Sequence, residues 1–273
     1  MLSAQFMGHE VDLALNMFRE THSGTLSGMT RFRDHLDDMP AAGYAYSAIA
    51  TDRIQSFLSL LFGHIANYQA RGTFNAPEQE SLYGDGGSTV AWTYSDSYRA
   101  QLGRTTEIDI DMCVPSTALV ALMLRWMLVF EERDTDVLWL LKGAPRRFYA
   151  ADAAASSPDL ILSVTDAPTR FGVISYKVVE LEQPDGNTSL SMRLVASVSL
   201  SGRGMVDAGN RTVSIVARLR DPTGARRLQH ADISAGPATL GGVNTTLETV
   251  TILVPLTPGS QSMVNFSLDA VLT

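Results

Sequence analysis

VPSTALVALMLRWMLVFEER, residues 114–133, is followed closely by VLWLLKGAPRRFY, residues 137–149, and the chain changes character between the two stretches. The first stretch is mostly apolar, and Pro115 stands where the first turn of a helix needs no amide hydrogen. It therefore predicts a buried helix. After the second stretch, short runs of alternating apolar and polar residues are separated by turn signals. The sequence predicts a helical part over residues 1–136 and a β part over residues 137–273.

Helical periodicity marks several segments of the helical part. Apolar residues three and four apart predict a long helix over residues 44–71, which Gly72 ends. Shorter helices are expected over residues 2–20 and 91–102. Together with the buried helix, these segments amount to about four or five helices of ordinary length.

Period-two alternation and turn residues mark the strands of the β part. After a first strand over residues 137–141, turn signals such as Pro-Asp-Gly-Asn separate the later runs. No segment of helical period interrupts them, which argues against a parallel βαβ sheet. We expect an antiparallel β-sandwich. The later strand candidates are residues 160–165, 172–180, 189–200, 212–220, 248–256 and 263–272.

The net charge of −8 belongs to the helical part. Residues 1–135 hold 9 Arg and 17 Asp or Glu, whereas residues 136–273 hold 12 basic and 12 acidic residues. A nucleic-acid partner needs a basic face, so none is expected. Two interpretations of the acidity stay open, a carboxylate-lined cleft for a neutral substrate and the ordinary negative surface of a soluble enzyme.

Other features exclude several kinds of site. The longest apolar run, Val114 to Phe130, is short for a membrane span and contains Arg125, so no membrane partner is expected. The single Cys113 rules out an internal disulfide and a multi-cysteine metal site. The five histidines show no metal spacing, and no nucleotide motif is present. No metal and no cofactor are expected.

Signals for the compartment are mixed. The first residues, MLSAQFMGHE, show neither the basic region nor the apolar region of a signal peptide. Four glycosylation sequons in the β part favour an extracellular location, although a Ser/Thr-rich domain also produces such triplets by chance. The sequons are at Asn187, Asn210, Asn244 and Asn265.

Three stretches resemble the carboxyl-terminal region of six-hairpin glycosidase-like proteins. They are residues 64–86, 106–149 and 164–178, and the matching elements are Lys142, Gly143, Pro145 and Arg146, then Ala167, Pro168, Thr169, Phe171 and Gly172. The resemblance implies an α+β multidomain fold, with the last helices of an α/α toroid followed by a β-sandwich. It also implies that the Lys-Gly-x-Pro-Arg element joins the first strand to the helical body.

A complete six-hairpin toroid is longer than the helical part. About twelve helices of ordinary length, with their loops, need well over 200 residues. We therefore expect the chain to be the carboxyl-terminal fragment of a longer protein, the alternative being a drastically shortened barrel.

Hydrolysis of a glycosidic bond generally needs two carboxyl groups. Glu78 is the first catalytic candidate, because the resemblance places its loop at the barrel mouth; alternatively it starts a helix after Pro77. Glu107 and Asp109 are the next candidates, because with Asp111 they line one side of an extended segment. Neighbours on one strand seldom flank a bond, so a catalytic partner is expected elsewhere. Solvated or salt-bridged carboxylates are the alternative.

Substrate-binding candidates lie on one side of the helix over residues 44–71. His64, Asn67, Tyr68 and Arg71 are three or four residues apart and can hydrogen-bond sugar hydroxyls, while Tyr68 or Trp92 offers a flat apolar face to a sugar ring. Contacts between the helix end and the next loop explain the same residues equally well.

The sequence thus predicts a glycoside hydrolase-like protein that cleaves a glycosidic bond by carboxylate acid and base chemistry. The alternative is a non-catalytic saccharide-binding or structural module. Carbohydrate is the expected partner in the first case and in the saccharide-binding case, with no oligomeric state predicted.

Overall fold

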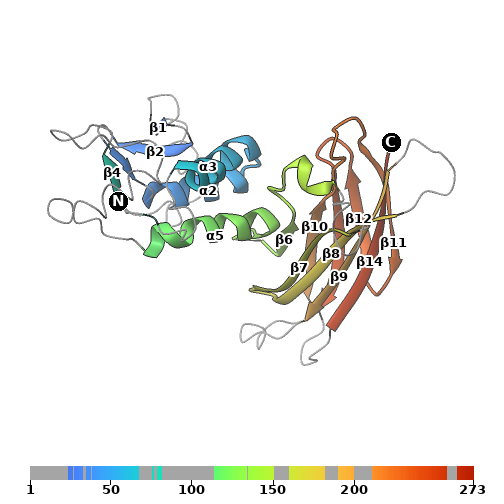
Figure 1. The fold of residues 1–273 in the computed structure, drawn as a ribbon. Helices are drawn as coiled ribbons and strands as arrows, with labels where there is room; N and C mark the ends of the chain where they lie inside the picture. Colours follow the sequence, from blue (N-terminus) through green and yellow to red (C-terminus); the bar gives the residue numbers. More distant parts are fainter. Residues whose placement is uncertain are drawn as a thin grey trace. The chain divides into compact units, whose positions relative to one another are not determined.

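The computed structural model divides into two compact units, Met1–Trp126 and Met127–Thr273, called here the amino-terminal unit and the β unit (Figure 1). The sequence had predicted parts over residues 1–136 and 137–273. The structure describes residues 24–26, 28–32, 35–37, 39–67, 76, 79–81, 114–133, 135–150, 160–181, 190–199, 211–256 and 263–273.

The amino-terminal unit combines helices with a small sheet. Its described helices are α2 (Met39–Ala50), α3 (Ile54–Asn67) and α5 (Val114–Leu128), the last of which continues into the β unit. Four short strands pair in an antiparallel sheet in the order β1-β2-β3-β4. These strands are β1 (Thr25–Leu26), β2 (Met29–Phe32), β3 (His35–Asp37) and β4 (Gln79–Ser81).

The predicted long helix over residues 44–71 is two helices in the structure. Asp52 has a φ of 62°, a left-handed conformation that an α-helix does not continue through. The Thr51 hydroxyl donates to the Ser47 carbonyl at 2.7 Å, and the Arg53 amide donates to the Ala48 carbonyl at 2.7 Å. These bonds satisfy carbonyl groups at the end of α2. The apolar period runs across the break because both helices bury a face.

The helices of the amino-terminal unit enclose a core. The ring of Tyr46 on α2 meets the ring of Trp126 on α5 edge to face, with centroids 5.4 Å apart. Such aromatic pairs add to the stabilisation that burial of apolar area provides. Other buried core residues include Ala45, Ile49, Phe57, Leu61 and Met123.

The predicted α/α toroid, and with it the partial-toroid fold class, is wrong. The described residues form three α-helices and are mostly β, and α2 and α3 both contact strand β2 of the small sheet. A toroid pairs helices with helices. Helical periodicity indicates that a segment buries one face but does not specify which kind of element covers that face.

The described residues of the β unit form two five-stranded sheets. The first has the order β12-β13-β10-β6-β5 and comprises β5 (Val129–Glu131), β6 (Val137–Leu140), β10 (Arg211–Arg218), β12 (Thr239–Asn244) and β13 (Thr249–Leu256). The second has the order β11-β14-β9-β8-β7 and comprises β7 (Leu160–Thr169), β8 (Gly172–Leu181), β9 (Leu190–Ser199), β11 (Leu228–Ala235) and β14 (Met263–Leu272).

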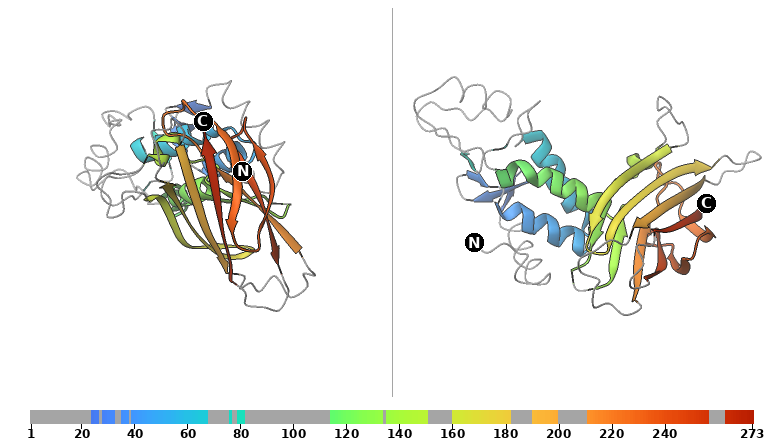
Figure 2. Two further views of the ribbon diagram at one scale, coloured as in Figure 1. Left: turned by 90° about the vertical axis from the view of Figure 1, so that its right-hand side faces the viewer. Right: turned by 90° about the horizontal axis from the view of Figure 1, so that it is seen from below.

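The two sheets lie face to face around one core, as Figure 2 shows. Alternate residues of strands such as β8 and β14 point inward, as the period of two requires. Ile174 and Val178 of β8 and Ile252 of β13 are all fully buried in this core. Pairing is antiparallel except between β6 and β10, which run parallel. This arrangement is compatible with the expected β-sandwich.

The six later strand candidates correspond to β7, β8, β9, β10, β13 and β14. Strands β11 and β12 were not predicted. The register of β11 shifts after Leu228 and again after Ile233, which breaks the period of two. Strand β12 is mostly exposed and contains Gly241 and Gly242, which have no side chain to show a pattern.

The stretch that marks the change of pattern spans the boundary of the units, because residues 114–126 belong to the amino-terminal unit and residues 127–149 to the β unit. The predicted helix over residues 114–133 ends at Leu128, and the residues after it form β5. The Leu141 amide donates to the Leu128 carbonyl at 2.9 Å, and the Gly143 amide donates to the Met127 carbonyl at 3.1 Å. The residues that follow β6 therefore satisfy the last carbonyl groups of α5.

Two buried cations pack behind this stretch. The Nζ atom of Lys142 lies 4.2 Å from the centroid of the Trp139 ring and 4.8 Å from that of Phe130, and 4.0 Å from the Glu132 carboxylate. Arg218 is fully buried and donates to the Lys142 carbonyl. Two aromatic ring faces and a carboxylate thus stabilise the buried charge of Lys142, and a carbonyl group stabilises that of Arg218.

The Lys-Gly-x-Pro-Arg element does not have the role that the resemblance implied for Arg146. Arg146 lies in the short 3₁₀ helix η2 (Arg146–Tyr149) and bonds the Asp221 carbonyl and the Glu248 carboxylate, both in the β unit. It therefore ties η2 to two turns of the β unit itself.

Candidate functional site

Most of the predicted site residues lie outside the described residues. They are the catalytic candidates Glu78, Glu107 and Asp109 and the substrate-binding candidates Tyr68, Arg71 and Trp92. Asn67 is the last residue of α3, and its side chain is also outside the description. All of these assignments stay predictions.

His64 is the one predicted site residue whose side chain the structure describes. It is fully buried in α3, and its Nδ1 atom lies 2.8 Å from the Leu60 carbonyl, to which the ring donates as the Nδ1 tautomer. Burial lowers the pKa of His64 to about 4, partly opposed by this bond. The ring is therefore neutral at neutral pH.

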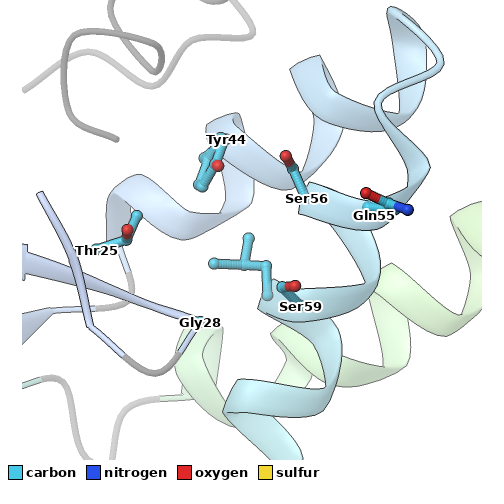
Figure 3. Close-up of a pocket in the computed structure, with 7 residues that line it drawn as sticks. Thr25, Gly28, Tyr44, Gln55, Ser56 and Ser59 are labelled. Carbon is cyan, nitrogen blue, oxygen red and sulfur yellow. The ribbon is translucent and has the colours of Figure 1, made fainter. Parts of the chain in front are cut away.

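A hollow of about 440 Å³ lies beside α3 in the amino-terminal unit. We call it the α3 hollow. Figure 3 shows four of the residues around the hollow: Tyr44 on α2, Ser56 and Ser59 on α3, and Thr25 on β1. Its volume falls within the range of small-molecule sites in proteins. The lining residues are Thr25, Gly28, Tyr44, Gln55, Ser56, Ser59 and Leu60.

The turn between β1 and β2 forms one wall of the α3 hollow. Gly28 in this turn has a φ of 81°, and a Cβ atom there would lie 2.1 Å from the Ser59 carbonyl oxygen and 3.2 Å from the Gly63 Cα. Only a residue without a side chain can approach the helix backbone so closely in this conformation. The turn therefore packs directly on the backbone of α3, where Gly28 lies against Ser59 and Gly63.

Helical spacing gives α3 two rows of residues at the hollow. Gln55 and Ser59 are four residues apart, as are Ser56 and Leu60, so each pair is vertically aligned on the helix surface. Tyr44 comes from α2 and is 5% exposed. The helix pair thus holds the lining groups in fixed positions, while Thr25 lies on the small sheet.

The described lining of the α3 hollow is polar and carries no charge. Thr25, Tyr44, Ser56 and Ser59 contribute hydroxyl groups, and Gln55 contributes an amide. Hydroxyls and amides both donate and accept hydrogen bonds. Tyr44 and Leu60 also line the hollow but are only 5% and 1% exposed. This combination suits a neutral ligand that itself carries several hydroxyl groups.

The described residues show neither a metal centre nor a long apolar helix. No group of three or more His, Cys, Asp or Glu side chains within them is arranged to hold a metal ion. Likewise, no helix in this part of the chain has the length and hydropathy to cross a membrane.

Comparisons with known proteins found no relative of this chain. No protein-family model matches it, and neither the curated proteins nor the solved structures contain a match. The predicted membership of the six-hairpin glycosidase-like group is therefore wrong: the expected toroid is absent from the described structure and no comparison points to that group.

None of the residues that line the α3 hollow was predicted as a site residue. A signal was nevertheless present, because positions 56, 60, 64 and 67 are three or four apart and continue the row of predicted sugar-binding positions toward the start of α3. The contribution of Thr25 depends on how the small sheet packs, which periodicity does not report.

Proposed function

We propose that the amino-terminal unit is a saccharide-binding module and that a neutral sugar binds in the α3 hollow. The observation that carries the proposal is the uncharged lining, with four hydroxyl-bearing residues and an amide around a space of about 440 Å³.

The uncharged lining favours a neutral sugar over an ionic ligand. Sugar hydroxyls donate and accept hydrogen bonds, and the hydroxyl and amide groups of Ser56, Ser59 and Gln55 can match either role. A charged ligand in such a site would lose its hydration without gaining an opposite charge, which is costly.

Binding without cleavage is the better-supported activity at this site. Glycoside hydrolysis generally requires two carboxyl groups beside the scissile bond. No carboxylate occurs among the described residues that line the α3 hollow. The hydrolase hypothesis depends on Glu78, Glu107 and Asp109, which lie outside the described residues.

A glycan array of neutral oligosaccharides tests the proposal, followed by isothermal titration calorimetry with the best ligand. We expect saturable binding, which Gln55→Ala and Ser56→Ala each weaken about two- to tenfold, as loss of one hydrogen bond implies. Ser163→Ala is the matched control, since Ser163 is exposed on β7 of the β unit.

A second variant tests the location independently of single hydrogen bonds. Ser59→Leu places a larger apolar side chain at the lining and is expected to abolish binding, while circular dichroism confirms the fold. The proposal is contradicted if no neutral oligosaccharide on the array binds, or if the wild type and all hollow variants bind with equal affinity. Release of new reducing ends from a bound oligosaccharide would show cleavage and favour the hydrolase hypothesis instead.

A further inference from the structure

Glu248 is a buried carboxylate at the start of β13. It is 1% exposed and has a φ of 56°. Arg146 binds it with both guanidinium NH2 groups, at 3.2 Å to Oε1 and 2.6 Å to Oε2. Bidentate arginine–carboxylate pairs of this kind are among the strongest hydrogen-bonded contacts in proteins.

Two further arginines approach the same carboxylate oxygen. Nε of Arg220 lies 3.4 Å and an NH2 nitrogen of Arg227 lies 3.5 Å from Oε2 of Glu248. Arg146 comes from η2, Arg220 follows β10, and Arg227 precedes β11. A residue of η2 and two residues of the segment between β10 and β11 therefore bring guanidinium groups to one oxygen atom.

A second buried carboxylate belongs to Asp221, which directly follows Arg220 in the sequence. It accepts hydrogen bonds from the Thr223 hydroxyl and from the amides of Ala225 at 2.8 Å and Arg226 at 3.2 Å. Burial raises the pKa of Asp221, but these bonds outweigh burial and hold it below its usual value. Its other oxygen lies 3.6 Å from the Arg226 guanidinium.

Among the described side chains of this group, positive charge exceeds negative charge. In the described structure, four guanidinium groups surround two carboxylates. The fully buried Arg218 adds a further positive charge beside Arg220. Burial, and then the charge of Arg218, lowers the pKa of Arg220.

The carboxylates are hidden, but the arginines reach solvent. Glu248 and Asp221 are buried, whereas the side chains of Arg226 and Arg227 are 37% and 55% exposed. An approaching ligand therefore meets guanidinium groups first. Each guanidinium has five donors, of which the two carboxylates occupy only a part.

We propose that this arginine cluster, Arg146, Arg220, Arg226 and Arg227, binds a tetrahedral oxyanion, the sulfate or phosphate group of a ligand. The planar fork of arginine matches the oxygen pairs of such groups. A bound oxyanion compensates the excess positive charge while Glu248 and Asp221 keep the guanidinium groups in place. The site lies in the β unit and does not depend on the saccharide proposal.

Isothermal titration calorimetry of the full chain with sodium sulfate and sodium phosphate tests the site. Sodium chloride keeps the ionic strength constant, because bulk salt screens surface charge in every variant. We expect one saturable site in the wild type, and at least about tenfold weaker binding in Arg226→Gln and Arg227→Gln. Arg227→Lys keeps the charge but loses the planar guanidinium, and its affinity is expected to lie between those of the wild type and Arg227→Gln.

Arg193→Gln is the matched control. It removes the same charge from the same unit, where Arg193 pairs with Asp269 at 2.6 and 2.8 Å. Unchanged affinity in this control supports a specific site, and an equal loss in all three glutamine variants overturns it. Absence of saturable heat in the wild type also overturns it, whether or not the variants fold.

A second pair of probes distinguishes the sources of the oxyanion. Heparin that binds while its desulfated form does not identifies sulfate groups of a glycan as the ligand, provided that Arg227→Gln weakens that binding. Inorganic phosphate or sulfate that binds while heparin does not identifies a small free anion. Heparin bound equally by the wild type and Arg227→Gln contradicts the site.

Discussion

Burial controls the chemistry of the histidine on α3. His64 is removed from water, and its ring is held by the carbonyl of Leu60, which also lines the α3 hollow. The sequence placed His64 on a helix edge and predicted a sugar-binding role for it. Periodicity gives the direction of a residue around a helix axis, but not what packs over it, so burial was not predictable. The sugar-binding role stays a prediction.

The lowered pKa of His64 makes stability dependent on pH. The folded-state pKa is about 4, below the ordinary value of 6.5, so the unfolded chain takes up the proton first as pH falls. The stabilising contribution is fully present above pH 6.5 and is lost as pH falls toward 4. The loss amounts to about 3 kcal/mol. Urea unfolding between pH 7.5 and 4.5 measures it.

A pair of variants isolates this contribution from that of the carboxylates. His64→Leu is expected to show a smaller loss of unfolding free energy over this range than the wild type. His230→Leu is the control, since His230 is exposed on β11, and its pH dependence is expected to follow the wild type. Parallel curves for the wild type and His64→Leu would disprove the assignment.

At the scale of elements, the contact between the β1–β2 turn and α3 shapes the α3 hollow. Gly28 and the backbone of Ser59 meet without any side chain between them. Gly28→Ala inserts a methyl group 2.1 Å from a carbonyl oxygen and imposes a left-handed backbone on alanine. We expect it to destabilise the amino-terminal unit by at least about 2 kcal/mol and to abolish sugar binding.

Gly242→Ala is the comparison for this prediction. No atom lies within 4 Å of a Cβ at Gly242, and its φ of 159° is close to extended. Chemical denaturation and sugar titration of both variants measure the two effects. If Gly28→Ala unfolds and binds like the wild type, the turn does not form the wall of the hollow.

The elements also show what a sequence can predict. Strands such as β8 and β14 bury every second residue, so their alternation was visible in the sequence. Asp52 breaks the long helix through its backbone conformation, which the apolar period across it conceals. Thr25 reaches the α3 hollow from a strand of two residues, too short for any periodicity to appear.

At the scale of the whole molecule, the chain contains two compact units, and the core of the β unit is formed by its two sheets. The change of pattern near residue 140 indicated that helices predominate before it and strands after it. The toroid was wrong because local motifs around Lys142 and Pro168 specify turns and strand ends, and such local geometry occurs in many architectures.

A core substitution tests whether each unit is stabilised by its own core. Ile252 is fully buried between the sheets, and Ile252→Ala is expected to cost the β unit about 2–5 kcal/mol. Hydrogen exchange followed by mass spectrometry reports both units at once. We expect faster exchange in β10, β13 and β14 and unchanged exchange in α2 and α3.

The reciprocal substitution is Ile49→Ala in the fully buried part of α2. It is expected to increase exchange in α2 and α3 while the strands of the β unit keep their protection. Equal acceleration in both units by either variant would show that the chain unfolds as a single cooperative body.

The parallel pairing of β6 with β10 has a consequence for how the chain folds. Leu138 and Leu140 of β6 pair with Ile215 and Ala217 of β10. Because β10 is synthesised much later than β6, this pairing cannot form until then. Pairings between residues so distant along the chain slow folding, because a long loop must close first. Until then β6 has only the three-residue strand β5 beside it. The β unit is therefore expected to reach its native state late and slowly, with an apolar strand exposed to other chains in the meantime.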